Sequence, residues 1–180
     1  MENKIYEIVP SQSKIQWVGK KVTGSHDGTI DVKSGEIILK DGKLAGGSFL
    51  VDTRSIKVLD ITDAATNAQM AGHLASDDFF SSQKFPEAAL DIISVNGNFI
   101  DANLTIKGIS NRIHFEAVVQ ANGTHLTASA KLLVDRTNYE MKFRSGNFFE
   151  NLGDTLIYND FELNVTITAK VVKNTTPVLS

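Results

Sequence analysis

Cysteine is absent from this chain of 180 residues. Its absence excludes disulfides, thiolate catalysis and thiolate metal sites, so packing alone must stabilise the fold. The formal net charge is only −3, and no basic run is longer than Lys20-Lys21, which leaves no electrostatic footprint for nucleic acid or an anionic bilayer. Long apolar runs are missing as well, because no stretch approaches the roughly 18 residues of a membrane span. We therefore expect neither a nucleic-acid partner nor an integral membrane segment.

The first residues, MENKIYEIVP, contain neither the basic segment nor the apolar run of a secretory signal peptide. Two locations are consistent with this start. The protein stays in the cytoplasm, or the sequence begins after a removed signal and the protein works in the periplasm or another extracytoplasmic space. The lack of cysteine agrees with both.

Alternation of apolar and polar residues at period two fills most of the chain and predicts strands with one buried face. It is most regular from Phe161 to Val171. Further strands are expected over 15–22, 29–40, 44–52, 87–95, 100–106, 113–119 and 126–134. Short turns such as Asn96-Gly97-Asn98 and Asn122-Gly123 favour antiparallel neighbours. About eight strands in a single domain over 1–180 predict an all-β closed barrel, whose interior is just filled or holds one small ligand.

One helix is expected over 64–75, because the segment is rich in alanine and Thr62 or Asp63 can cap it. An aromatic connection, HLASDDFFSSQKFP from His73 to Pro86, continues from the end of this helix, and a second one covers 136–155. These two connections hold six of the ten phenylalanines, namely Phe79, Phe80, Phe85, Phe143, Phe148 and Phe149. Connections cluster at barrel ends, so these rings can line an opening, or they can form a satellite core under long loops.

Small residues on the strands are expected to leave room inside the barrel. They are Gly46, Ser48, Ala128 and Ala130. Catalytic and metal motifs, in contrast, are not found. His114 and Glu116 alternate with apolar residues and should face solvent, while Asp77-Asp78 are better explained as helix caps than as a catalytic pair. For His73, a hydrogen bond at the helix end and a place in a pocket both stay open.

Four motifs, in order, carry a family resemblance: HLASDDFFSSQKFP, LTIKGIS from Leu104, DRTNY from Asp135 and LGDTLI from Leu152. Together they resemble the YceI-like family of bacterial lipocalin-type barrels across roughly residues 5 to 171. The resemblance implies an eight-stranded antiparallel lipocalin-like barrel, with one helix packed near one end and a polyisoprenoid or isoprenoid-quinone-like ligand in the lumen. It implies no other cofactor, and members are often exported to the periplasm.

The resemblance also implies positions for site residues. It places His73, Leu74, Phe79 and Phe80 beside the pocket entrance, and Asp135, Arg136 and Tyr139 at a strand end that faces it. Many relatives carry Arg-Asp where this chain has Met70-Ala71, and His where Gln12 stands, so no polar contact to a ligand headgroup is expected at these positions.

The leading hypothesis is a non-enzymatic protein that carries or sequesters a long apolar isoprenoid lipid. The candidate ligand-binding residues are Trp17, Phe49, His73, Leu74, Phe79, Phe80, Ala128, Ala130, Asp135, Arg136, Tyr139, Phe143 and Phe148. No catalytic and no metal-binding residue is expected, and a homodimer is an allowed assembly. The alternatives are a ligand-free barrel that binds a partner through its outer surface, and a lipocalin-like enzyme that uses His73 or Asp135 on an apolar substrate.

Overall fold

The computed structural model describes residues 3–21, 24–141 and 157–175. These residues form nine strands, one α-helix and two short 3-10 helices. The strands are β1 (Asn3–Ile8), β2 (Lys14–Lys21), β3 (Gly24–Lys40), β4 (Lys43–Val58), β5 (Glu87–Asn96), β6 (Phe99–Ile106), β7 (Ile109–Asn122), β8 (His125–Asp135) and β9 (Ile157–Thr175). The helix is α1 (Ala64–Ala75), and the 3-10 helices are η1 (Pro10–Gln12) and η2 (Arg136–Tyr139). The chain is thus mostly strand, as expected.

The nine strands form one antiparallel sheet that closes into a barrel of eight positions. Its order is β1-β3-β2-β9-β8-β7-β6-β5-β4, and the pairing of β3 with β4 closes it. Both β1 and β2 lie between β3 and β9, β1 at one end and β2 at the other, so together they occupy a single position. The predicted eight-stranded barrel is therefore confirmed, with one of its strands interrupted.

Pro10 begins the interruption between β1 and β2. Proline has no N–H to donate to a ladder, and the chain turns through η1 at this point. The backbone groups of the neighbouring strand β9 find other hydrogen-bond partners there. The Val9 amide donates to the Thr168 carbonyl at 2.8 Å, and the Thr168 amide donates to the Ser13 hydroxyl at 3.1 Å. The break therefore leaves the wall of the barrel hydrogen-bonded.

Alternation along the strands places one apolar face in the lumen. Leu126, Ala102 and Ala169 are fully buried there. The expectation that Gly46 and Ser48 also face inward is wrong. Leu39 pairs with Leu44 and Ile38 pairs with Gly46, so one extra residue between 44 and 46 shifts the alternation. Ser48 consequently lies opposite the exposed residues Glu36 and Asp91 on the outer face.

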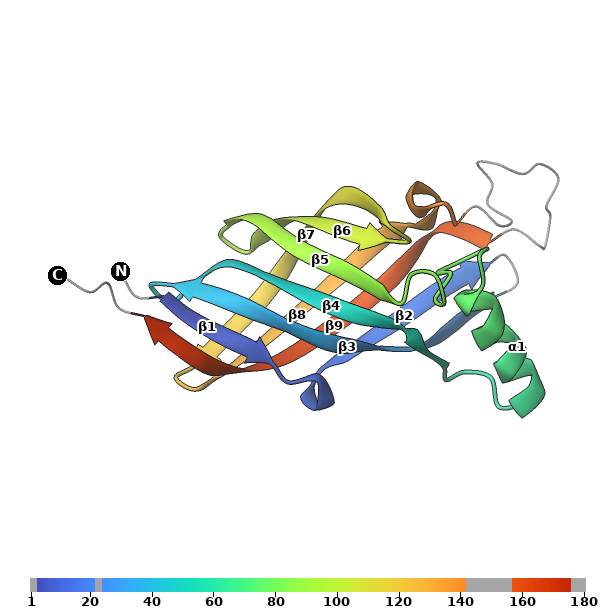
Figure 1. Cartoon of the computed structure of the whole chain (residues 1–180), viewed down its shortest axis with the longest axis horizontal. Coiled ribbons are helices and arrows are strands. Elements are labelled where there is room, and N and C mark those ends of the chain that lie inside the picture. The colour runs from blue at the N-terminus through green and yellow to red at the C-terminus, as the bar shows by residue number, and fades with distance from the viewer. Residues whose placement is uncertain (1–2, 22–23, 142–156, 176–180) are drawn as a thin grey trace.

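Helix α1 lies at one end of the barrel, opposite the end where β1 starts and β9 finishes (Figure 1). Asp63 caps it, as predicted, and accepts a hydrogen bond of 2.9 Å from the Thr66 amide. The Asn67 side chain ties the helix to the barrel through the carbonyls of Val58, at 2.7 Å, and Ile61, at 3.1 Å. No helix in the described ranges is long and apolar enough to span a membrane.

Candidate functional site

The lumen contains two adjoining apolar cavities. The helix-end cavity, about 160 Å³, lies beneath α1 and the aromatic connection, and its walls are almost entirely carbon. The inner cavity, about 90 Å³, lies farther along the barrel and is also lined by carbon. The two share a set of wall residues: Ile15, Val51, Ala88, Leu104 and Leu163. These shared side chains lie between the two cavities.

Trp17 forms one wall of the helix-end cavity and is fixed by β4, the strand beyond its neighbour β3. Its indole Nε1 donates a hydrogen bond of 3.1 Å to the Lys57 carbonyl. Gly28, the residue opposite Trp17 on β3, makes this position available. A Cβ at Gly28 would lie 2.6 Å from Cζ2 of the indole and would also collide with the Lys57 carbonyl. The absence of a side chain at residue 28 therefore determines where the indole lies.

The aromatic connection after α1 supplies the roof of the same cavity. Phe79 is buried, and the His73 ring packs edge-on against it with centroids 5.0 Å apart. Phe80 packs edge-on against Phe161 of β9 at 6.2 Å. His73 also lies 3.2 Å, through Nε2, from the Asp78 carboxylate. His73 therefore does both things that the sequence left open: its ring contacts Asp78 at the end of the helix, and it lines the helix-end cavity.

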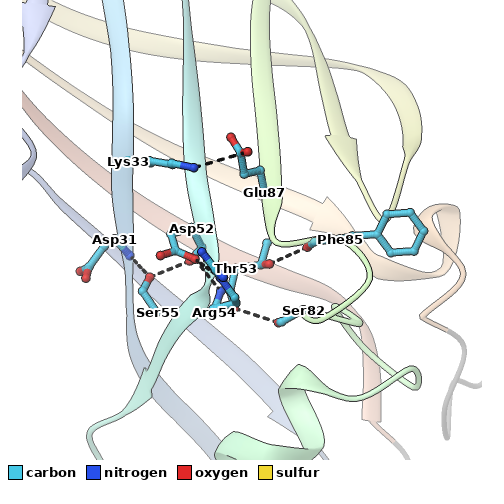
Figure 2. A network of polar contacts seen from close by, with 9 residues as sticks. All are labelled: Asp31, Lys33, Asp52, Thr53, Arg54, Ser55, Ser82, Phe85 and Glu87. Atoms are coloured by element: carbon cyan, nitrogen blue, oxygen red, sulfur yellow. Dashed lines mark hydrogen bonds and ion pairs between the residues drawn. The ribbon is translucent and has the colours of Figure 1, made fainter.

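A buried polar network holds this connection against β4 (Figure 2). The Thr53 hydroxyl donates to the Phe85 carbonyl at 2.6 Å, and the Ser82 hydroxyl donates to the Thr53 carbonyl at 2.9 Å. The Thr53 amide also donates to the Pro86 carbonyl at 3.0 Å. Thr53 and Ser82 are each 2% exposed, so these bonds are shielded from water. Sequence reasoning missed both residues: Thr53 lies in no motif, and Ser82 lies within HLASDDFFSSQKFP but was not singled out there.

Arg136 places a buried cation at this end of the lumen. The side chain is 2% exposed, lines the helix-end cavity and lies over the Phe79 ring, 5.7 Å from its centroid. Its guanidinium donates to the Met141 carbonyl. Burial lowers the pKa of Arg136 to about 10, although the nearby Asp135 carboxylate opposes the shift. Arg136 therefore stays a cation at neutral pH, and its charge is met by the Met141 carbonyl and the face of the Phe79 ring.

The structure divides the candidate residues into three groups. Trp17, His73, Leu74, Phe79, Phe80 and Arg136 line the helix-end cavity, and Phe49, Ala128 and Ala130 line the inner cavity. Asp135 and Tyr139 line neither cavity. Instead, Asp135 caps η2 by accepting from the Thr137 amide at 3.0 Å, and Tyr139 is buried beside this turn. Phe143 and Phe148 lie outside the described residues.

Several lining residues were not singled out from the sequence. Gly19, Met70, Met141, Phe161 and Leu163 all border the helix-end cavity. Phe161 and Leu163 belong to the apolar phase of the most regular strand, so the alternation could have identified them. Met70 adds an apolar side chain from α1 to the wall. No group of three His, Asp or Glu side chains suitable for a metal gathers within the described ranges.

Comparisons with known proteins agree with this architecture. The family model for the YceI-like domain matches residues 6–169. BcnA of Burkholderia cenocepacia has a similar structure, with a TM-score of 0.65 and 20% identity over 91% of this chain and 99% of that one. A search of curated protein sequences finds no match.

Two further solved structures have the same fold. A polyisoprenoid binding domain from Saccharophagus degradans superposes with a TM-score of 0.69 and 15% identity, covering 93% of this chain and 98% of that one. The YceI protein of Campylobacter jejuni gives a TM-score of 0.56 at 15% identity, covering 86% of this chain and 85% of that one. Because the family model extends from β1 into β9, the chain belongs to the family of YceI-like domains.

Proposed function

We propose that this protein binds an isoprenoid-type apolar lipid inside its barrel. The observation that carries the proposal is the pair of adjoining cavities whose walls are almost entirely carbon. Such walls offer an alkyl or prenyl chain a dry site and offer a polar ligand almost no partners. The similar structure from Saccharophagus degradans, named as a polyisoprenoid binding domain, supports this class of ligand.

The driving force is burial of the chain. Each methylene removed from water contributes about 0.8 kcal/mol, so a chain of about fifteen carbons offers roughly 12 kcal/mol. Micromolar binding requires roughly 8 kcal/mol, which leaves a margin for the cost of ordering the chain. Polar contacts are therefore unnecessary for affinity, and the length and shape of the lumen set the selectivity.

The size of the cavities determines how a chain must lie. An apolar cavity of about 150 Å³ accommodates one benzene ring. The helix-end cavity is of this size and the inner cavity is smaller, so a chain of several isoprene units occupies both. The shared side chains Val51, Leu104 and Leu163 then move aside to join the two cavities.

The helix-end cavity also provides a place for the polar end of such a lipid. Lys20, Lys21, His26 and Asp160 border it, and both lysines are exposed. A hydroxyl or a quinone ring at the end of the chain keeps its water there while the tail lies deeper. This arrangement suits prenyl alcohols and isoprenoid quinones equally.

We further propose that the bound lipid is carried or sequestered, in the periplasm if the protein is exported. A ligand-free barrel that acts only through its outer surface would need no apolar space inside. An enzyme would need a polar group directed at the bound chain, and the His73 and Asp135 side chains already bond to Asp78 and Thr137. Binding without turnover is therefore the favoured activity.

The direct test is titration with farnesol, followed by the emission of Trp17, the single tryptophan. Gly19 lines the helix-end cavity, and a Cβ there would meet no atom within 4 Å. Gly19→Leu should fill this space and weaken farnesol binding at least tenfold. Gly46→Leu makes the same change on the outer face of β4, where a Cβ would lie 4.0 Å from Ile38 Cδ1, and should leave binding unchanged. Wild-type protein that does not bind farnesol, or equal binding by both variants, would overturn the proposal.

A further inference from the structure

The ladder between β7 and β8 ends before either strand does. The two strands pair from Ala117 to Asn122 against His125 to Ala130. Beyond that point, residues 109–116 of β7 pair with β6, and residues 131–135 of β8 pair with β9. Among the described residues, no pairing joins these two segments to each other. We call this unpaired stretch of the wall, between 109–116 and 131–135, the seam.

The seam is bounded at both ends. The paired part of the β7–β8 hairpin closes one end. At the other end, side chains bridge the strands to η2 and to the aromatic connection. Asn111 donates to the Asn138 carbonyl at 3.0 Å, and Lys107 Nζ donates to the carbonyls of Glu140, at 3.2 Å, and Asp77, at 2.8 Å. The seam is therefore a window in a wall that is held together on either side of it.

An external groove lies over the start of this window. Glu116, Val118 and Lys131 line it from the two strands that separate. The groove shares Ser129, Ala130 and Val165 with the inner cavity, so the same residues border the outside and the lumen. Ala130 pairs with Ala117 at the last step before the seam, and its inward side chain is only a methyl group.

Apolar side chains also lie on the outer surface beside the seam. Val118 is 53% exposed and Leu133 is 66% exposed, and they belong to the two strands that separate. An apolar chain that crosses the wall here keeps contact with carbon on the outside, within the wall at Ala130, and in the inner cavity. The path is thus apolar throughout, although charged residues flank it.

We propose that the seam is a side portal through which the apolar chain enters and leaves the inner cavity. This inference rests on the proposed function, because it assigns the route of the same ligand. Entry through the roof of the helix-end cavity requires the aromatic connection to move. That movement breaks the buried bonds of Thr53 and Ser82, each of which costs about 1–3 kcal/mol when its partner is left unsatisfied. Widening the seam breaks no ladder bond, so it is the easier opening.

The first test links the two edges of the seam. In the register of the hairpin, His114 would face Leu133, and both side chains are exposed, so cysteines there can be joined by a cleavable bismaleimide. The control pair, Gln120→Cys with Thr127→Cys, lies on the same face of the same strands where they are already paired. The chain has no other cysteine. Exchange of bound tritiated geranylgeraniol against unlabelled alcohol is then followed by gel filtration.

The linked seam should slow exchange at least tenfold, and cleavage of the linker should restore the rate. The linked control should stay within twofold of wild type. Equal exchange rates with the seam linked and unlinked would overturn the portal while leaving the proposed function intact. Wild-type protein that retains no geranylgeraniol would overturn the proposed function instead, so the two failures are distinguishable.

A second measurement does not depend on linking. Ala130→Cys, at the last pair before the seam, should react with a bulky maleimide from outside much faster than Ala128→Cys, its inward neighbour farther inside the paired region. Leu104→Cys controls for entry from the helix end, because Leu104 lines both cavities. The portal predicts a rate at residue 130 at least tenfold above both controls. A faster reaction at residue 104 would show that access runs beneath α1 and would contradict the portal.

Discussion

The hydroxyl of Thr53 donates a 2.6 Å hydrogen bond to the carbonyl of Phe85, 32 residues farther along the chain. This bond fastens the end of the aromatic connection to β4 (Figure 2). Phe79 and Phe80 of the same connection line the helix-end cavity. A buried polar contact thus fixes the position of an apolar roof. Its strength determines how rigidly that roof is held.

Thr53→Val should destabilise the protein, because it leaves the Phe85 carbonyl without its donor in a buried site. We expect a loss of about 1–3 kcal/mol in the free energy of unfolding, measured by urea denaturation. Thr105→Val removes an exposed hydroxyl that lies 2.6 Å from Ser110 and should cost less than about 0.5 kcal/mol. Equal losses in the two variants would show that the Thr53 bond does not hold the roof.

Substitution by alanine should have opposite effects on the free energy of unfolding at two glycines on neighbouring strands. Gly28→Ala forces a methyl group into the Trp17 ring and the Lys57 carbonyl, so it should cost about 1–3 kcal/mol and shift the emission of Trp17. Gly19→Ala projects into open lumen and should be neutral or stabilising by about 0.5–1 kcal/mol. Urea denaturation measures both, and a stable Gly28→Ala with unchanged emission would contradict the packing described for Trp17.

The inner cavity should set the length of chain that the protein accepts. Ala128→Leu fills that cavity and leaves the helix-end cavity untouched. We expect geranylgeraniol to bind at least tenfold more weakly, because several carbons lose their burial, while geraniol binds as before. Thr127→Leu, on the outer face of β8, is the control. If the binding of both alcohols weakens equally, the chain of geranylgeraniol does not reach the inner cavity.

Lowering the pH should weaken the contact between His26 and Asp60, which lies shortly before the start of α1. Burial opposes ionisation of Asp60, but hydrogen bonds from His26 and from the Asp27 amide outweigh it and lower the pKa of the carboxyl. A lowered carboxyl pKa contributes stability above the unfolded value of about 3.9, and this stability is lost as the pH falls through the folded value.

Asp60→Asn should therefore be less stable than wild type by about 0.5–1 kcal/mol at pH 5.5. The difference should shrink toward pH 2.5, as the wild-type carboxyl takes up its proton on passing through its lowered pKa. Urea denaturation at both pH values measures it, with Asp91→Asn, an exposed carboxylate on β5, as the control. A difference that stays constant between the two pH values would show that the charge of Asp60 is not involved.

Elements whose signals are local could be predicted from the sequence. The helix has the expected bounds of 64–75, because alanine-rich composition and the Asp63 cap act within one turn. The inward phase of Ala128 and Ala130 is correct, since β8 has no bulge to disturb period two. The family resemblance, and not a local signal, implied that His73, Leu74, Phe79 and Phe80 lie beside the pocket, and all four line the helix-end cavity.

Features set by distant partners could not be predicted. The inward orientation expected of Gly46 and Ser48 fails because an extra residue in β4 shifts the alternation, and only the register with β3 reveals it. Thr53 and Ser82 are 29 residues apart in sequence, so nothing in the sequence relates one to the other. The seam is also invisible in the sequence, because apolar alternation continues through β7 and β8 after their pairing ends.

Native mass spectrometry of the protein, purified without detergent and then supplied with geranylgeraniol, is the decisive measurement of isoprenoid binding. We expect a one-to-one complex that survives transfer to the gas phase. We also expect organic solvent to release, from the freshly purified protein, a lipid in a mass series spaced by isoprene units. Bare protein in both samples, with no bound alcohol at saturating concentration, would contradict the claim that this barrel binds an isoprenoid chain.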